Sequence, residues 1–169
     1  MLHRRWYGLS LILAMLPLAK AHGQTAVTPE ERAVLAVVDT LLEAMSRRDV
    51  ALSRRMLVPG ASLHAIRDGN ELGPARSQSD SAYLGSLASD TSALRERIWN
   101  PTTVITGTLA QLWAPYDFHV NRQFSHCGVD SFNLLKTASG WQVASVAYTV
   151  KRQGCEPSPL GPLGPAPDR

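Results

Sequence analysis

The sequence lacks a long apolar run, and outside its first residues it lacks an excess of either charge. Its longest mostly apolar run, residues 9–18, is about half of the roughly 20 residues that span a bilayer, so we expect no permanent membrane anchor. Three of the 17 basic residues lie in the first 21 positions, which leaves 14 basic and 14 acidic residues. A neutral domain lacks the basic stripe that nucleic-acid binding requires, so we expect no nucleic-acid partner.

Sequence motifs of several chemical classes are missing as well. The chain has no G-x-S-x-G or S-x-x-K motif of a serine nucleophile and no glycine-rich phosphate-binding loop. Its two cysteines are too few for a structural zinc site, and the histidines at 64, 119 and 126 lack metal-binding spacing. We therefore expect neither a metal nor a cofactor.

The first 21 residues have the three-part layout of a secretory signal peptide. Arg4 and Arg5 precede the apolar run, and the segment Ala19-Lys20-Ala21 supplies the small residues of a cleavage site. We expect cleavage after Ala21 and export of the mature protein, which is then periplasmic or secreted. An oxidising compartment favours a disulfide over two free thiols, which predicts a bridge between Cys127 and Cys155.

Helical signals dominate the first half of the mature chain. Thr28 and Pro29 predict the start of a long amphipathic helix, and Asp49 predicts the start of a short helix that ends before Pro59. A third helix is expected within residues 77–89. A short strand is expected between the second and third helices, at residues 61–67.

From residue 95 the apolar period changes to two, which is typical of β-strands. The expected strands are residues 95–99, 103–106, 109–120, 124–137 and 141–151, and the short turns between them favour antiparallel hairpins. Helices followed by such strands predict an α+β fold in one domain, residues 22–155, with the long helix covering one face of the sheet. The prolines of residues 156–169 indicate a disordered tail.

The expected hairpins predict which side chains lie opposite each other. A two-residue turn at Asn121-Arg122 places Asp117 opposite His126 and Trp113 opposite Asp130. Opposed side chains lie about 5 Å apart, so Asp117 and His126 could share a charge-assisted hydrogen bond that keeps the imidazole protonated. This pair also has a plainer interpretation, as a contact at the tip of a surface hairpin.

The same register gathers polar and aromatic side chains on one face of a curved sheet, as a ligand cavity requires. The candidate catalytic residues are Asp117, His126 and Asp130, and the candidate ligand-binding residues are Trp113, Tyr116, Phe132 and Tyr148. Asp130 is the most informative, because a carboxylate in an apolar strand needs a partner if it is buried. For Trp113 and Phe132, core packing is the alternative.

Several segments of the chain resemble the nuclear transport factor 2-like superfamily. The opening VLAVVDTLLEAMSRRDVALSRRMLVPGASL resembles its first helices, and residues 113–118, 124–130 and 140–143 resemble an exported bacterial subgroup described as SnoaL-like or lumazine-binding-like. The resemblance covers roughly residues 30–155. It implies a cone-shaped α+β fold, in which a strongly curved antiparallel sheet wraps around a pocket closed by the long helix, with two shorter helices. Dimers through the sheet are frequent in the superfamily, so a homodimer is a further expectation.

Function does not follow from this fold, so three hypotheses stay open. The first is an exported pocket protein of the cell envelope that binds a small apolar or aromatic molecule. The second is an isomerase or dehydratase in which a pocket carboxylate or His126 acts as a general base. The third is an assembly module without a ligand.

Overall fold

The computed structural model describes residues 27–68 and 72–164, and the predicted signal peptide lies outside this part of the chain. Its helices are α1 (Pro29–Arg47), α2 (Val50–Met56) and α3 (Asp80–Ser89). Its strands are β1 (Leu57–Arg67), β2 (Arg76–Ser79), β3 (Leu94–Ile98), β4 (Thr102–Thr106), β5 (Leu109–Val120), β6 (Gln123–Thr137) and β7 (Gly140–Val150). The helices begin close to the predicted residues, and the hairpins also lie close to their predicted positions.

Helix α1 begins where its capping residues predict. The Thr28 side chain accepts a hydrogen bond from the Glu31 amide, and the Glu31 carboxylate accepts one from the Thr28 amide, which completes a capping box. Arg48 ends the helix in the left-handed conformation, and Asp49 caps α2 through the Leu52 amide. The sharp break between the two helices therefore comes from local capping chemistry.

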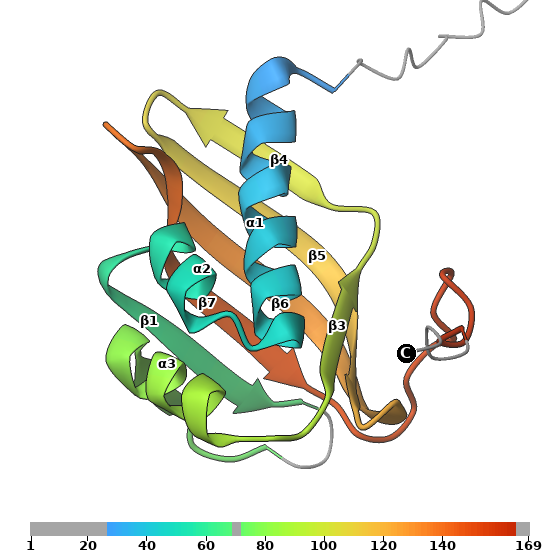
Figure 1. Cartoon of the computed structure of the whole chain (residues 1–169). Helices are drawn as coiled ribbons and strands as arrows, with labels where there is room; N and C mark the ends of the chain where they lie inside the picture. Colours follow the sequence, from blue (N-terminus) through green and yellow to red (C-terminus); the bar gives the residue numbers. More distant parts are fainter. Residues whose placement is uncertain (1–26, 69–71, 165–169) are drawn as a thin grey trace, which may run out of the picture.

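The strands form one mixed, strongly bent sheet in the order β2-β1-β7-β6-β5-β3, with β4 pairing beside β3 on β5 (Figure 1). The expectation of a wholly antiparallel sheet is wrong at one place, since β1 and β7 run parallel. Short turns force neighbouring strands to be antiparallel, but β1 and β7 are far apart in sequence and no short turn constrains their direction. Helix α1 crosses one face of the sheet (Figure 1).

The core lies between α1 and this concave face. Val34, Val38 and Leu41 of α1 are buried against apolar residues of β5, β6 and β7. The central members of the sheet side are Leu112, Phe132, Leu134 and Val143. The other face of the sheet is convex and carries large exposed side chains, including Val104, Leu109 and Trp113.

The predicted turn at Asn121-Arg122 is present, and both residues take positive φ values of 50° and 68°. Val120 pairs with Gln123 as expected, but a bulge after Phe124 shifts the register of the rest of the β5–β6 hairpin. His126 therefore pairs with Phe118, and Asp117 pairs with Cys127 instead of His126. The predicted pairing of Trp113 with Asp130 is wrong for the same reason. A bulge inserts one unpaired residue, which moves later side chains to the other face.

The predicted bridge between Cys127 and Cys155 is present, and it joins the chain after β7 to the convex face. Residues 156–164 hold no helix or strand, but Pro157, Gly161 and Pro162 border the same hollow as Asp117. Arg122 donates a hydrogen bond to the Gly164 carbonyl, so this part of the tail makes contacts that the sequence did not predict. Within residues 27–68 and 72–164, no helix has the length and apolar character to cross a membrane.

Candidate functional site

A pocket of about 180 Å³ lies between α1 and the concave face of the sheet. Much of its wall is apolar and comes from Leu41, Leu42, Met45, Leu63, Phe132 and Val146. Its polar groups are the carboxyls of Glu96 and Asp130, the imidazole of His126 and the hydroxyls of Tyr83, Tyr116 and Tyr148. An apolar cavity with a few convergent polar groups is the usual form of a small-molecule site. We call this cavity the inner pocket.

Two carboxyl groups meet in the inner pocket. Asp130 is 2% exposed on β6, and Glu96 reaches it from β3. No N–H or O–H group of the described residues donates a hydrogen bond to Oδ2 of Asp130, which is fully buried. A proton held between the two carboxyls is therefore the group that can satisfy this oxygen.

Burial and the neighbouring acid set the protonation of this pair. Burial raises the pKa of Asp130 well above its ordinary value, and the Glu96 charge and hydrogen bond raise it further. Burial also raises the pKa of Glu96, to about 7, although the hydrogen bond from Asp130 opposes this rise. Asp130 is thus the donor and Glu96 the acceptor. Two neighbouring carboxyl groups in a buried pocket cannot both ionise without a large electrostatic cost.

The tyrosines around the pair have different roles. The Tyr116 ring lies against Gly128, where a Cβ atom would come within 2.8 Å of ring carbon Cε1. Its hydroxyl donates to the Thr149 carbonyl at 2.7 Å, so Tyr116 is held across β6 onto β7. The Tyr148 hydroxyl has no such bond to the described residues, and it remains a free donor. Burial and the two acids raise the pKa of Tyr148, which keeps that hydroxyl protonated.

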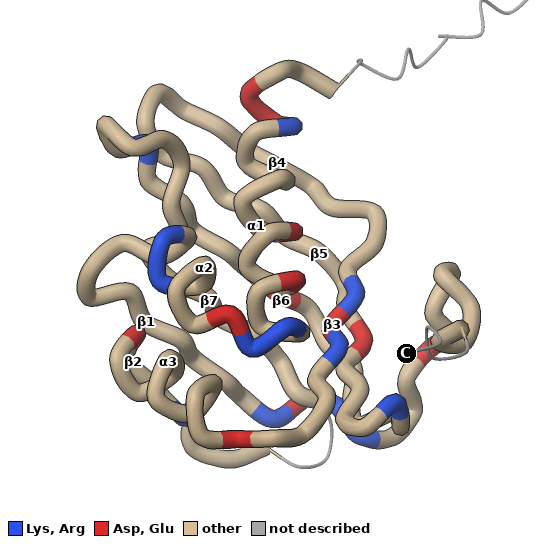
Figure 2. The backbone as a smooth tube through the Cα atoms, in the orientation of Figure 1, with Lys and Arg blue, Asp and Glu red and all other residues tan. Residues whose placement is uncertain are grey.

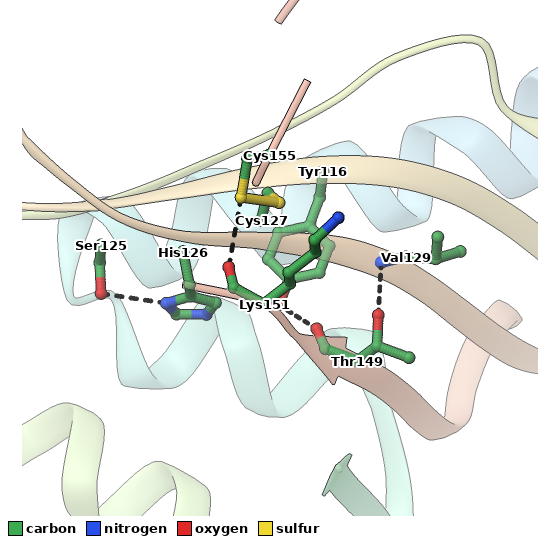
Figure 3. The surroundings of a disulfide bond; sticks show 8 residues. All are labelled: Tyr116, Ser125, His126, Cys127, Val129, Thr149, Lys151 and Cys155. Carbon is green, nitrogen blue, oxygen red and sulfur yellow. Dashed lines mark hydrogen bonds between the residues drawn. A yellow bond between two sulfur atoms is a disulfide. The ribbon is translucent and has the colours of Figure 1, made fainter. Parts of the chain in front are cut away.

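His126 lies at one end of the inner pocket. Its ring stacks on Phe118 with a centroid distance of 4.9 Å, and its Nδ1 atom lies 3.0 Å from the Ser125 hydroxyl. Burial lowers the pKa of His126 to about 4, and the charge of Arg152 lowers it in the same direction. Figure 3 shows this ring on one side of β6 and the disulfide on the other. The prediction of a protonated His126 beside Asp117 is therefore wrong.

The structure brings together five of the seven candidate residues named from the sequence: Tyr116, His126, Asp130, Phe132 and Tyr148. It also pairs Asp130 with Tyr148, as predicted, because a second bulge in β7 restores the expected register. Trp113 is instead 51% exposed on the convex face. Asp117 is buried on that face too, where two hydrogen bonds from the Arg97 guanidinium hold it.

Glu96 is the functional candidate that the sequence analysis missed. It belongs to a strand that was predicted at residues 95–99, and its neighbours in sequence are Arg95 and Arg97. From the sequence alone, an acid between two arginines indicates a strand whose side chains face solvent. The signal that could have identified it is strand alternation, which places Glu96 on the face opposite to both arginines.

No family model matches the sequence, and no curated protein is significantly similar to it. Solved structures share the fold at low sequence identity. An NTF2-like protein of unknown function from Shewanella baltica is 20% identical, with 76% of this chain and 95% of that chain covered and a TM-score of 0.53. An NTF2-like protein from Cytophaga hutchinsonii is 13% identical, with 73% and 99% covered and a TM-score of 0.60.

A third similar structure is a proposed dehydratase of the NTF2-like family from Streptomyces avermitilis. It is 19% identical, with 70% of this chain and 94% of that chain covered and a TM-score of 0.56. Structural similarity at these identities concerns the fold and does not carry an activity. The chain thus has the cone-shaped α+β fold of NTF2-like proteins.

Proposed function

We propose that this protein binds a small, mostly apolar molecule in the inner pocket. The observation that carries the proposal is the Asp130–Glu96 pair, which places two hydrogen-bonding carboxyl groups inside a mostly apolar cavity. A buried acid pair costs stability, so its presence in a cavity favours a functional role. The ligand therefore has an apolar body and one oxygen, such as a carbonyl or hydroxyl, that meets the acid pair.

The proposal includes export to the periplasm or the exterior. The predicted signal peptide supports it, and so does the disulfide between Cys127 and Cys155, because such bridges persist in oxidising compartments. The resemblance of residues 113–118 and 124–130 to exported SnoaL-like or lumazine-binding-like proteins is a third support. The proposal needs no metal or cofactor.

The test uses octanol as an apolar probe with one hydroxyl. Val146 borders the inner pocket, so Val146→Trp should fill the cavity and abolish octanol binding in an NMR titration. Val104→Trp is the matched control, because Val104 is exposed on the convex face and its replacement should leave binding intact. Equal octanol binding by both variants, or none by the wild type, would contradict the proposal.

A second candidate function is proton transfer of the isomerase or dehydratase type. It is favoured by one specific observation, the unequal protonation of Asp130 and Glu96 in one cavity. Glu96 in its ionised form would remove a proton next to a carbonyl. Asp130 and the Tyr148 hydroxyl would donate hydrogen bonds to the carbonyl oxygen as negative charge develops there.

This second function predicts catalysed exchange of α-protons. The wild-type protein should accelerate deuterium uptake by cyclohexanone in heavy water, measured by NMR, and Glu96→Gln should abolish the acceleration. The glutamine variant cannot accept the proton. It keeps the size of the side chain and can still hydrogen-bond a hydroxyl, so octanol binding should survive. Exchange at the same rate with the wild type and Glu96→Gln would leave only the binding function.

A further inference from the structure

A second cavity, of about 520 Å³, opens next to the inner pocket at the end of the sheet where β1 and β7 finish. We call it the outer cleft. Leu63, His126 and Tyr148 border both cavities, so the outer cleft adjoins the inner pocket. A molecule that occupied both cavities would lie against these three shared side chains.

Three arginines border the outer cleft, and strand topology explains why they meet there. Arg67 ends β1, Arg152 follows the end of β7, and Arg76 begins β2. Because β1 and β7 are parallel, their ends lie together, and the start of the antiparallel β2 joins them. Figure 2 shows basic residues at this end of the sheet, together with acidic ones.

Strand pairing also places the three arginine positions on the concave side. Arg76 pairs with Ala65, two residues before Arg67 on the same face of β1. Arg67 pairs with Val150, and Arg152 is two residues further along. The parallel pairing that the sequence did not predict thus brings the arginines of the outer cleft together.

Among the described residues, the wall of the outer cleft carries a net positive charge, although the acidic residue Asp68 directly follows Arg67 in the chain. The wall of the outer cleft contains no aspartate or glutamate within residues 27–68 and 72–164. None of these three arginines takes part in the ion pairs between described residues. The arginines also act on the groups between the cavities, since Arg152 lowers the pKa of His126 and Arg76 opposes the rise in the pKa of Tyr148.

From this arrangement we infer that the ligand is a small amphipathic carboxylic acid, with its carboxylate bound by Arg67, Arg76 and Arg152 and its apolar body in the inner pocket. Arginine is suited to this role because its guanidinium binds carboxylates through two parallel hydrogen bonds. The inner pocket disfavours the carboxylate, since the ionised form of Glu96 would repel it. The inference rests on the proposed binding function and adds the chemical class of the ligand.

The test compares octanoate with octanol, which share a chain and differ in charge. At low salt, octanoate should bind the wild type about tenfold more tightly than octanol, as expected for one strong charge-assisted interaction. The double variant Arg67→Gln/Arg152→Gln should lose that preference and keep octanol binding. The matched control is Arg54→Gln/Arg55→Gln, which removes two exposed arginines of α2 outside both cavities and should retain the preference.

Each other outcome contradicts a specific part of the account. If octanol binds and octanoate has no advantage, or if its advantage survives in Arg67→Gln/Arg152→Gln, the inference is wrong and the binding function stands. Sulfate tests the other source of negative charge. If sulfate binds the wild type as tightly as octanoate does, and displaces octanoate without affecting octanol binding, the outer cleft is a site for free inorganic anions and the inference is also wrong. If neither octanol nor octanoate binds, both proposals fail.

Discussion

Asp117 and Asp130 are two nearly buried aspartates on neighbouring strands that face opposite sides of the same sheet. Asp117 is 4% exposed on the convex face and is bound by the guanidinium of Arg97. Asp130 is 2% exposed on the concave face, and its partner is the carboxyl of Glu96. The two aspartates are similarly buried but have opposite electrostatic surroundings. The partner of each aspartate therefore decides its role.

Both partners come from β3, where Glu96 and Arg97 are adjacent. Strand alternation directs these two side chains to opposite faces, so one short strand delivers a negative group to the pocket and a positive group to the convex face. An arginine makes Asp117 a stable ion pair with a structural role. The neighbouring acid Glu96 forces Asp130 to keep its proton. The concave face therefore carries a carboxyl group that can bind or transfer a proton.

The largest expected effect comes from removing the partner of Asp117. Arg97→Leu should lower the free energy of unfolding by about 3–5 kcal/mol, because it leaves the buried Asp117 carboxylate with only the His119 imidazole, at 3.6 Å, beside it. Urea unfolding measures this loss. Arg95→Leu is the control, since Arg95 and its partner Glu43 are both well exposed and such pairs contribute less than about 1 kcal/mol. Equal losses in the two variants would contradict the structural role of Asp117.

The disulfide tests whether the two faces are independent. Cys127 pairs with Asp117 on the convex face, and its bridge closes a loop between residues 28 positions apart. Cys127→Ser/Cys155→Ser should lower the free energy of unfolding by about 3 kcal/mol. Octanol binding in the inner pocket should persist under conditions where the variant remains folded. Loss of octanol binding from the folded variant would show that the bridge also shapes the concave face.

The smallest effect concerns His126, which borders the concave side of the same hairpin. Its imidazole should stay neutral until the pH falls to about 4, because burial and Arg152 both lower its pKa. Arg152→Gln should move the NMR titration of His126 to higher pH, since it removes a positive charge. Asp117→Asn should leave that titration unchanged, and a response to this variant would place Asp117 and His126 on the same face.

Local signals in the sequence were sufficient for much of the fold. The Thr28 capping box, the Asn121-Arg122 turn and the period of two after residue 95 predicted elements that the structure contains. These signals involve residues close together in the chain, where capping and turn chemistry act. The parallel pairing of β1 with β7 depends on contacts between distant segments, so local signals do not reveal it.

The candidate site was predicted only in part for a related reason. Asp130 and Tyr148 were correctly placed side by side, but one unpaired residue near Ser125 moved Asp117 to the other face relative to His126. No residue type in this hairpin predicts a bulge. The position of Glu96 next to Asp130 depends on how β3 joins the far side of β5, which no turn in the sequence specifies.

The central claim, that Asp130 and Glu96 share a proton inside the pocket, is tested most directly by carbon-13 NMR of the two carboxyl groups across a pH series. The Asp130 carboxyl should keep the chemical shift of the protonated acid at neutral pH, and Glu96→Gln should move its titration to lower pH because a like charge is removed. Ionisation of both carboxyls near the ordinary values, about pH 4, would contradict the claim.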